Sequence, residues 1–211
     1  MKLYDNEWAP SPRRVRIYLA EKGINVERVS VDLRRNEHFD DAYLAINPRG
    51  MVPALELDDG MVICESAAIC RYFEAAQPQP PMFGATPVDV ATIESWTRRI
   101  ENDGYAAAVY VFRNATPRME GRGAAGKWPP IPLIPELAHR GAIMWRAFVE
   151  GLEQRLAGRQ WIATDEFSFA DITALITIDF AERAARLAVP DDCTNLARWR
   201  AAAGARPSAS A

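Results

Sequence analysis

The sequence predicts an α/β domain followed by an all-helical domain. Strand and helix patterns alternate over residues 1–76, three prolines interrupt residues 77–86, and residues 87–211 carry only helical periodicity. We therefore expect a first domain at 1–76, a proline-stiffened linker at 77–86 and a second domain at 87–211. With 211 residues, the chain has enough material for a packed core in each domain.

The first domain is expected to begin with a strand at residues 2–5 and a helix that starts at Ser11. Serine is a favoured N-cap residue, Pro12 suits the first helical position, and Gly23 is a helix stop. The remaining pattern predicts a strand over 26–31, a short helix over 39–44, hairpin strands over 54–57 and 61–64, and a helix over 66–76. The order β-α-β-α-β-β-α is typical of a thioredoxin-like domain.

The second domain is expected to be built from helices alone. The periodic segments cover residues 87–113, 136–156, 168–187 and 195–203. Thr86 is suited to cap the first of these helices, and Ser168 with Asp171 fits an N-cap and its partner three residues on. The proline- and glycine-rich stretch at 117–135 is expected to form an ordered loop or irregular insertion, and the last residues to be frayed.

Composition narrows the class of partner. The net charge of -3 argues against nucleic acid or an anionic membrane surface, and no apolar run reaches membrane-spanning length. Three cysteines without a dense framework favour a reducing compartment, so we expect a cytoplasmic location. No Cys-x-x-Cys pair is present, which disfavours dithiol chemistry, and Cys64 and Cys70 are expected to be small buried hydrophobes.

The strongest functional signal lies in the second half of the first domain. Pro53 follows Val52 at the start of a short apolar run, an arrangement that can present the Val52 main chain as an open edge. Glu65 and Ser66 then open an apolar-periodic segment, as at a helix N-terminus. A backbone edge beside a helix N-terminus suits a small peptide-like anion.

These motifs give the chain a resemblance to the cytosolic glutathione transferase (GST) superfamily, and within it to serine-type, theta-like bacterial members. The resemblance rests on residues 47–55 (Asn-Pro-Arg-Gly-Met-Val-Pro-Ala-Leu), residues 65–69 (Glu-Ser-Ala-Ala-Ile) and residues 168–171 (Ser-Phe-Ala-Asp). It implies a thioredoxin-like domain that binds glutathione, followed by an all-helical GST C-terminal domain that holds an electrophile. It also implies a homodimer and no metal.

The resemblance further implies how glutathione is held. Pro53 would be cis, which turns the Val52 N–H and C=O outward to pair with the cysteinyl part of glutathione. Glu65 would face the γ-glutamyl ammonium, and Ser66 would hold the γ-glutamyl carboxylate. The alternative is that Ser66 only caps its helix and Glu65 only complements the helix dipole; together with Val52-Pro53, the ligand interpretation is favoured.

The glycine carboxylate of glutathione needs a cation or another donor. His38 stands at the spacing at which theta-like members carry a binding histidine, although a solvated surface histidine is an equal alternative. Met51 occupies the position where many relatives have lysine or glutamine, and its side chain offers no charge-assisted bond. The resemblance thus places Met51 at this end of the site, which either weakens binding there or transfers the anchoring to His38 or Arg13.

Catalysis requires glutathione as a thiolate near neutral pH. Lowering the thiol pKa by two units takes roughly 2.7 kcal/mol, which one or two hydrogen bonds to the charged sulfur can supply. Ser11 is the expected thiol activator, with N-capping as its alternative role. Trp8 would form a wall of the substrate site and Asn6 would be an alternative donor, whereas Tyr4 lies slightly early for a tyrosine-type catalyst.

The resemblance assigns the electrophile pocket to the first long helix of the second domain. Tyr105 and Arg113 are the expected pocket residues, and Tyr110 and Phe112 are expected to pack in the core. The implied function is a glutathione S-transferase of the detoxification type, which activates the thiol for attack on a small hydrophobic electrophile. The alternatives are a non-catalytic GST-like binding or assembly protein, or a glutathione-dependent isomerase, dehalogenase or peroxidase.

Overall fold

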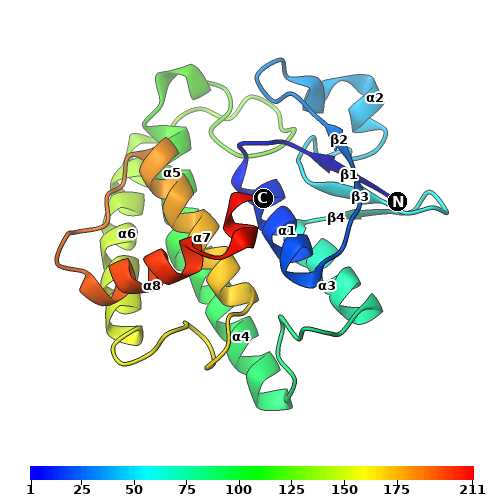
Figure 1. Cartoon of the computed structure of the whole chain (residues 1–211). Coiled ribbons are helices and arrows are strands. Elements are labelled where there is room, and N and C mark those ends of the chain that lie inside the picture. The colour runs from blue at the N-terminus through cyan, green and yellow to red at the C-terminus, as the bar shows by residue number, and fades with distance from the viewer. The chain divides into compact units, whose positions relative to one another are not determined.

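A four-stranded mixed sheet organises the N-terminal part of the chain in the computed structural model, which describes all 211 residues (Figure 1). Its strands are β1 (Lys2–Asp5), β2 (Glu27–Ser30), β3 (Ala54–Glu56) and β4 (Val62–Cys64), in the spatial order β2-β1-β3-β4. β1 and β2 are parallel, and β3 is antiparallel to both β1 and β4. This topology confirms the predicted thioredoxin-like fold of the first domain.

Four helical segments accompany the sheet. They are α1 (Pro10–Lys22), the 3-10 turn η1 (Glu37–Phe39), α2 (Asp41–Leu44) and α3 (Ser66–Ala76). α1 packs against α3, and in Figure 1 the two lie together on one side of the strands with α2 on the other. Leu3, Ile17, Leu55 and Ile69 are completely buried and form the core between the strands and the α1–α3 pair.

The start of α1 differs from the sequence prediction. The helix begins at Pro10 with Ala9 at the N-cap, so the assignment of Ser11 as N-cap is wrong and Ser11 is the second helical residue. Two prolines made the choice ambiguous, because a proline fits the first helical position at Pro10 as well as at Pro12. The chain uses the earlier proline.

The remainder of the chain is helical, as predicted. The elements are α4 (Pro87–Arg99), the π-helix η2 (Ile100–Tyr105), α5 (Ala106–Asn114), η3 (Pro117–Met119), α6 (Pro135–Arg155), α7 (Phe169–Phe180), the π-helix η4 (Ala181–Ala185), α8 (Thr194–Gly204) and η5 (Pro207–Ser210). The expectation of a frayed end is wrong, because η5 is a 3-10 helix whose Ser208 is buried. No helix combines the length and the apolar character needed to cross a membrane.

Two predicted caps are present in this helical part. Thr86 Oγ accepts the Asp89 N–H at 3.1 Å at the start of α4. At the start of α7, the Asp171 carboxylate accepts the Ser168 N–H at 3.0 Å and also the Trp199 Nε1–H at 2.8 Å. Ser168 and Asp171 therefore have the folding role that the sequence indicated.

Internal contacts divide the residues into two units that do not follow the chain order. The first unit contains residues 1–80, 125–129 and 211, and the second contains 81–124 and 130–210. A short piece of the proline- and glycine-rich stretch thus belongs with the sheet. The boundaries expected from the sequence, at 1–76, 77–86 and 87–211, stay predictions.

Candidate functional site

The sheet topology brings three predicted site segments of the first unit to one edge. Tyr4 is opposite Ala54, and Ala54 is opposite Cys64. Because β3 runs against both neighbours, the end of β1, the start of β3 and the end of β4 lie at the same edge. The β1–α1 loop, the Val52-Pro53 pair and the start of α3 follow directly from these three strand ends.

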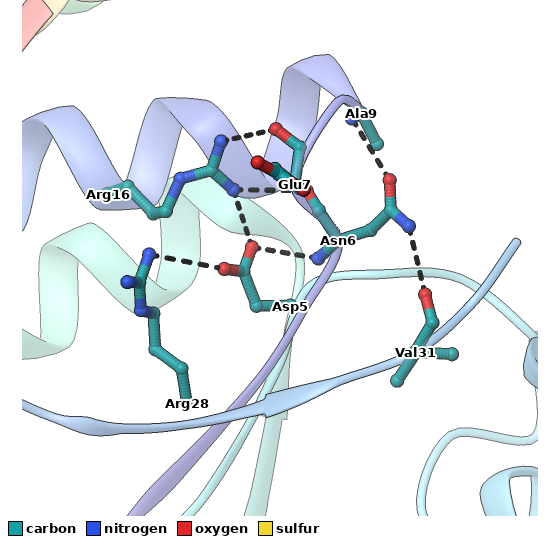
Figure 2. Close-up of polar contacts among 7 residues, drawn as sticks. All are labelled: Asp5, Asn6, Glu7, Ala9, Arg16, Arg28 and Val31. Atoms are coloured by element: carbon teal, nitrogen blue, oxygen red, sulfur yellow. Dashed lines mark hydrogen bonds and ion pairs between the residues drawn. The ribbon is translucent and has the colours of Figure 1, made fainter. Parts of the chain in front are cut away.

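The β1–α1 loop is fixed by a buried ion pair, which Figure 2 shows. Arg16 donates from Nη1 to Asp5 Oδ1 at 2.7 Å and to the Asn6 carbonyl at 3.0 Å, and from Nη2 to the Glu7 carbonyl at 2.7 Å. Asp5 and Arg16 are both buried, so the pair is shielded from solvent screening. The guanidinium therefore holds the backbone of the loop in a single conformation.

Asn6 supports the same loop from its other side (Figure 2). Its Nδ2 donates to the Val31 carbonyl at 2.9 Å, and its Oδ1 accepts the Ala9 N–H at 3.1 Å. The amide is buried and connects the end of β1 to the end of β2 and to the start of α1. These contacts favour a supporting role over the thiol-donor role considered from the sequence.

Ser11 stands in the first turn of α1, between two prolines. Proline has no N–H, so among Pro10, Ser11 and Pro12 only Ser11 carries a backbone donor, and it adds a hydroxyl at the positive end of the helix dipole. Ser11 is half-buried. Trp8, in the preceding loop, is 55% exposed, with the Arg34 guanidinium 5.8 Å from its ring centroid.

The Val52–Pro53 peptide bond is cis, as the resemblance implied. The carbonyl of the preceding Met51 accepts both the Tyr43 hydroxyl at 2.6 Å and Asn47 Nδ2 at 2.7 Å. By contrast, neither the N–H nor the C=O of Val52 has a hydrogen-bond partner within the chain. Because Met51 is held and Val52 is not paired, the Val52 main chain is an open edge for an extended peptide.

The start of α3 is contacted by a buried cation of α1, Arg14, which sequence reasoning missed. Ser66 is buried, and its Oγ accepts Arg14 Nε at 3.1 Å and Arg14 Nη2 at 2.7 Å. Arg14 is also buried, on the face of α1 shared with Tyr18. An arginine on an otherwise apolar helix face is the one sequence signal that could have identified it.

Glu65 precedes Ser66 in an unusual backbone conformation. It occupies the N-cap position of α3 with φ of 69°, and no side chain caps the helix, so the alternative of Ser66 as an N-cap is wrong. Glu65 Oε1 pairs with Arg49 Nη1 at 3.2 Å, and both side chains are exposed. The α3 N-terminus therefore keeps its backbone donors without competition from a capping side chain.

His38 is buried rather than solvated. It is 6% exposed, its ring centroid lies 3.9 Å from that of Phe39, and the surface interpretation of this residue is wrong. Gly50 packs against the same segment: with φ of +58°, an added Cβ would lie 2.8 Å from the Phe39 ring and 3.0 Å from the His38 carbonyl. His38 thus lies beside the turn that leads into the half-buried Met51, and its ligand role stays a prediction.

The other titratable groups near this edge are poor thiol activators or nucleophiles. A hydrogen bond from the Tyr4 hydroxyl to Glu56 at 2.7 Å raises the pKa of Tyr4, with burial and nearby glutamates adding to the effect. Burial raises the pKa of Cys64 and of Cys70, and the neighbouring Glu65 charge adds to it at Cys64. Cys70 is buried as expected, whereas Cys64 is only half-buried.

The two expected electrophile-pocket residues lie in the second unit. The Tyr105 and Phe112 rings both contact Phe180, with centroids 5.7 Å and 5.4 Å apart. Burial lowers the pKa of Arg113, whose Nη1 donates to the Arg122 carbonyl at 2.9 Å. A hollow of about 220 Å³ in this unit, lined by residues that include Trp96 and Phe148, contains neither Tyr105 nor Arg113.

Comparison with known proteins agrees with this geometry. Residues 8–76 match the family model described as glutathione S-transferase, N-terminal domain, and residues 146–207 match the corresponding C-terminal domain. The chain is 34% identical to glutathione S-transferase 2 of Saccharomyces cerevisiae over 99% of its own length and 87% of that protein. It is 41% identical to maleylacetoacetate isomerase of Pseudomonas aeruginosa over 52% of its length and 48% of the relative.

A solved structure is similar to this chain over almost its full length. The crystal structure of a glutathione S-transferase domain-containing protein from Marinobacter aquaeolei VT8 superposes with a TM-score of 0.88. The two sequences are 36% identical, and the match covers 99% of each chain. Both predicted domain folds therefore occur together in a relative of known structure.

Proposed function

Since the chain belongs to the glutathione S-transferase family, we propose that the sheet edge of its first unit binds glutathione and activates the thiol for attack on a small hydrophobic electrophile. The main observation in support of this proposal is that the Val52 N–H and C=O, beside cis-Pro53, have no hydrogen-bond partner within the chain. The enzyme uses glutathione as its co-substrate, and the residue roles below are our assignments.

Glutathione is held by three neighbouring groups. The Val52 N–H and C=O pair with the cysteinyl residue as one added strand position. The Ser66 N–H and hydroxyl receive the γ-glutamyl carboxylate at the α3 N-terminus, where the buried Arg14 adds a positive charge. The Glu65 carboxylate faces the γ-glutamyl ammonium, so the two charged groups of the γ-glutamyl residue each meet the opposite charge.

The sulfur of the bound cysteine is stabilised as a thiolate at the start of α1. Ser11 supplies its hydroxyl and the only N–H of the first three helical residues, and the helix dipole favours negative charge there. Together these groups can provide the roughly 2.7 kcal/mol needed to lower the thiol pKa by two units. The thiolate then forms a C–S bond to an electrophilic carbon, while the bond from that carbon to a leaving group such as chloride breaks and the leaving group departs with its electron pair. Proximity of the two bound reactants contributes to the acceleration.

The electrophile is a small hydrophobic molecule, and Trp8, Tyr105 and Arg113 are its proposed contacts. A glutathione-dependent isomerase is a second candidate, because the Pseudomonas aeruginosa relative that matches 52% of the chain is named maleylacetoacetate isomerase. Either activity begins with the same thiolate. We also propose a homodimer and a cytoplasmic location with a role in detoxification, as is usual for members of this family.

Replacement of Ser11 tests the proposal. Ser11→Ala removes the hydroxyl but keeps the N–H, so we expect the pKa of bound glutathione to rise and kcat/KM for a chlorinated nitroarene to fall about 10- to 100-fold near neutral pH. The pKa is measured from thiolate absorbance of the complex as a function of pH. Ser30→Ala, at an exposed position on β2, is the matched control and should leave both quantities unchanged.

Three results would contradict parts of this proposal. Failure of the wild-type protein to bind immobilised glutathione would remove the assigned site altogether. Binding with an unchanged thiol pKa in Ser11→Ala would assign activation to another donor. Turnover of maleylacetoacetate, without conjugation of any electrophile tested, would favour the isomerase.

A further inference from the structure

We infer that the segment Ala125–Pro129, here called the loop tip, completes the glutathione site and that Lys127 binds the glycine carboxylate. The inference rests on the function proposed above. Met51 offers no charged partner for the glycine carboxylate of glutathione, and the inference assigns that part to Lys127. The loop tip belongs to the first unit, as do the sheet and the turn that precedes Val52.

The loop tip is docked on the turn that precedes Val52. The Lys127 N–H donates to the Arg49 carbonyl at 2.7 Å. Gly126 has φ of +92°, and a Cβ added there would lie 3.0 Å from the Arg49 carbonyl oxygen and 3.2 Å from Met51 Sδ. Glycine suits this position, because other residues rarely adopt this backbone conformation and a side chain here would crowd Arg49 and Met51. The loop tip therefore packs closely against residues 49–51 and is hydrogen-bonded to them.

The loop tip is also constrained along its own length. Trp128 Nε1 donates to the Ala125 carbonyl at 2.7 Å and so closes the tip on itself. The residues on either side of it are joined by two backbone hydrogen bonds, from the Gly123 N–H to the Ile131 carbonyl and from the Ile131 N–H to the Gly121 carbonyl, each at 3.0 Å. Lys127 is thus presented from a closed loop, which reduces the entropy lost when it binds a ligand.

The direction in which bound glutathione runs brings its glycine residue close to the loop tip. With the γ-glutamyl carboxylate at Ser66 and the cysteine on Val52, the glycine lies one residue further along an extended peptide, about 3.4 Å beyond the cysteine. The turn at 49–51 and the loop tip border that position, since both adjoin the residue before Val52. Glycine's carboxylate then meets whichever cation these segments provide.

Lys127 is the cation best suited to that carboxylate. Its side chain is exposed and forms no ion pair with any carboxylate of the chain, whereas the Arg49 guanidinium already pairs with Glu65. A lysine ammonium on a flexible stem can reach a carboxylate as a point charge without a fixed fork geometry. Lys127 thus supplies the positive charge that Met51 lacks, although the two residues are far apart in the sequence.

Calorimetric titration of the full-length protein with two ligands tests the assignment. Glutathione and its ethyl ester at the glycine carboxyl differ in one charge at this position. We expect the wild-type protein to bind glutathione about fivefold more tightly than the ester, the size of an exposed ion pair. Lys127→Met should bind both ligands with the ester's wild-type Kd, and Lys127→Arg should restore the preference.

Two further variants separate charge from docking. Lys2→Met removes one exposed lysine from β1 and should keep the wild-type preference, which excludes an effect of net charge alone. Gly126→Val keeps Lys127 but displaces the loop tip, so it should lose the preference. Retention of the preference by Lys127→Met, or its absence in the wild-type protein, overturns the inference while glutathione binding still supports the proposed function. Absence of any glutathione binding overturns both.

Discussion

Arg14 illustrates, at the scale of a single residue, how a buried cation prepares a site for an anion. Burying a guanidinium is costly unless its donors are satisfied, and here two of them are used by the neutral Ser66 hydroxyl. A ligand carboxylate beside Ser66 would bring a negative charge close to the Arg14 guanidinium, which favours the bound state. The buried position then favours binding, because the interaction is screened less than at the surface.

Arg14→Lys should weaken glutathione binding because lysine keeps the charge but loses the planar fork that contacts Ser66. We expect the Kd of glutathione to rise about tenfold, which corresponds to about 1.4 kcal/mol. Calorimetry gives the Kd directly. Arg28→Lys on β2, where the arginine is exposed, is the matched control.

A change in stability without a change in Kd would show that Arg14 only supports the packing of α1 on α3. The unfolding free energy of both variants should therefore be measured beside the Kd. A purely structural role would lower the unfolding free energy and leave the two Kd values equal to that of the wild-type protein.

Features of the candidate site differ in how far they depend on neighbouring residues in the sequence. The Val52-Pro53 turn and the helix start at Ser66 could be predicted, because an X-Pro pair and a helix start are recognisable from neighbouring residues, whereas the ligand roles of these residues stay predictions. Arg14 could not, since its partner Ser66 is 52 residues away. The same holds for Tyr43, whose contact with the Met51 carbonyl depends on how η1 and α2 fold back on the turn.

At the scale of the element, the prediction that a serine caps the start of a helix was correct at α7 and wrong at α1, and the two helix starts show why. At α7, Ser168 and Asp171 satisfy each other's groups in a buried environment, and the cap is needed. At α1, Pro10 and Pro12 remove two of the backbone donors that a cap would satisfy. A side-chain cap is therefore unnecessary at α1, where Ala9 is the N-cap residue.

The start of α8 uses a third solution, a cap provided by another helix. Glu153 of α6 accepts the Asn195 N–H at 3.0 Å and the Leu196 N–H at 2.8 Å. Burial alone would raise the pKa of Glu153, but these hydrogen bonds and the Arg198 charge outweigh it and leave the pKa below its ordinary value. The ionised carboxylate is thus the form that stabilises the fold.

Glu153→Gln should lower the free energy of unfolding by about 1 kcal/mol at pH 7, as expected for a lost helix cap. A carboxyl group with a lowered folded pKa contributes stability above its unfolded pKa of about 4.3, and this is lost as pH falls through the folded value. The difference between variant and wild type should therefore shrink below about pH 4. Urea denaturation at both pH values measures it.

Glu150→Gln, at an exposed position one turn earlier on α6, is the control and should change stability little at either pH. An equal loss for Glu153→Gln at both pH values would mean that shape rather than charge stabilises the start of α8.

At the scale of the whole molecule, the chain order does not coincide with the structural units. The alternation of strands and helices followed by helices alone was sufficient to predict an α/β part and an all-helical part. The loop tip at 125–129 could not be assigned in this way, because one backbone hydrogen bond and a glycine contact determine its place. Such contacts leave no periodic pattern in the sequence.

Hydrogen exchange on glutathione binding should reveal this division of the molecule. At a glutathione concentration of 100 times Kd, binding stabilises the liganded state by about 2.7 kcal/mol. Amides that exchange by opening of the site should then slow by up to about 100-fold. We expect the Lys127 amide, which donates to Arg49, to be slowed together with those of β3, whereas the amides of η3 are unchanged. Residue-resolved exchange by NMR measures all three; protection of β3 with no change at Lys127 would exclude the loop tip from the site.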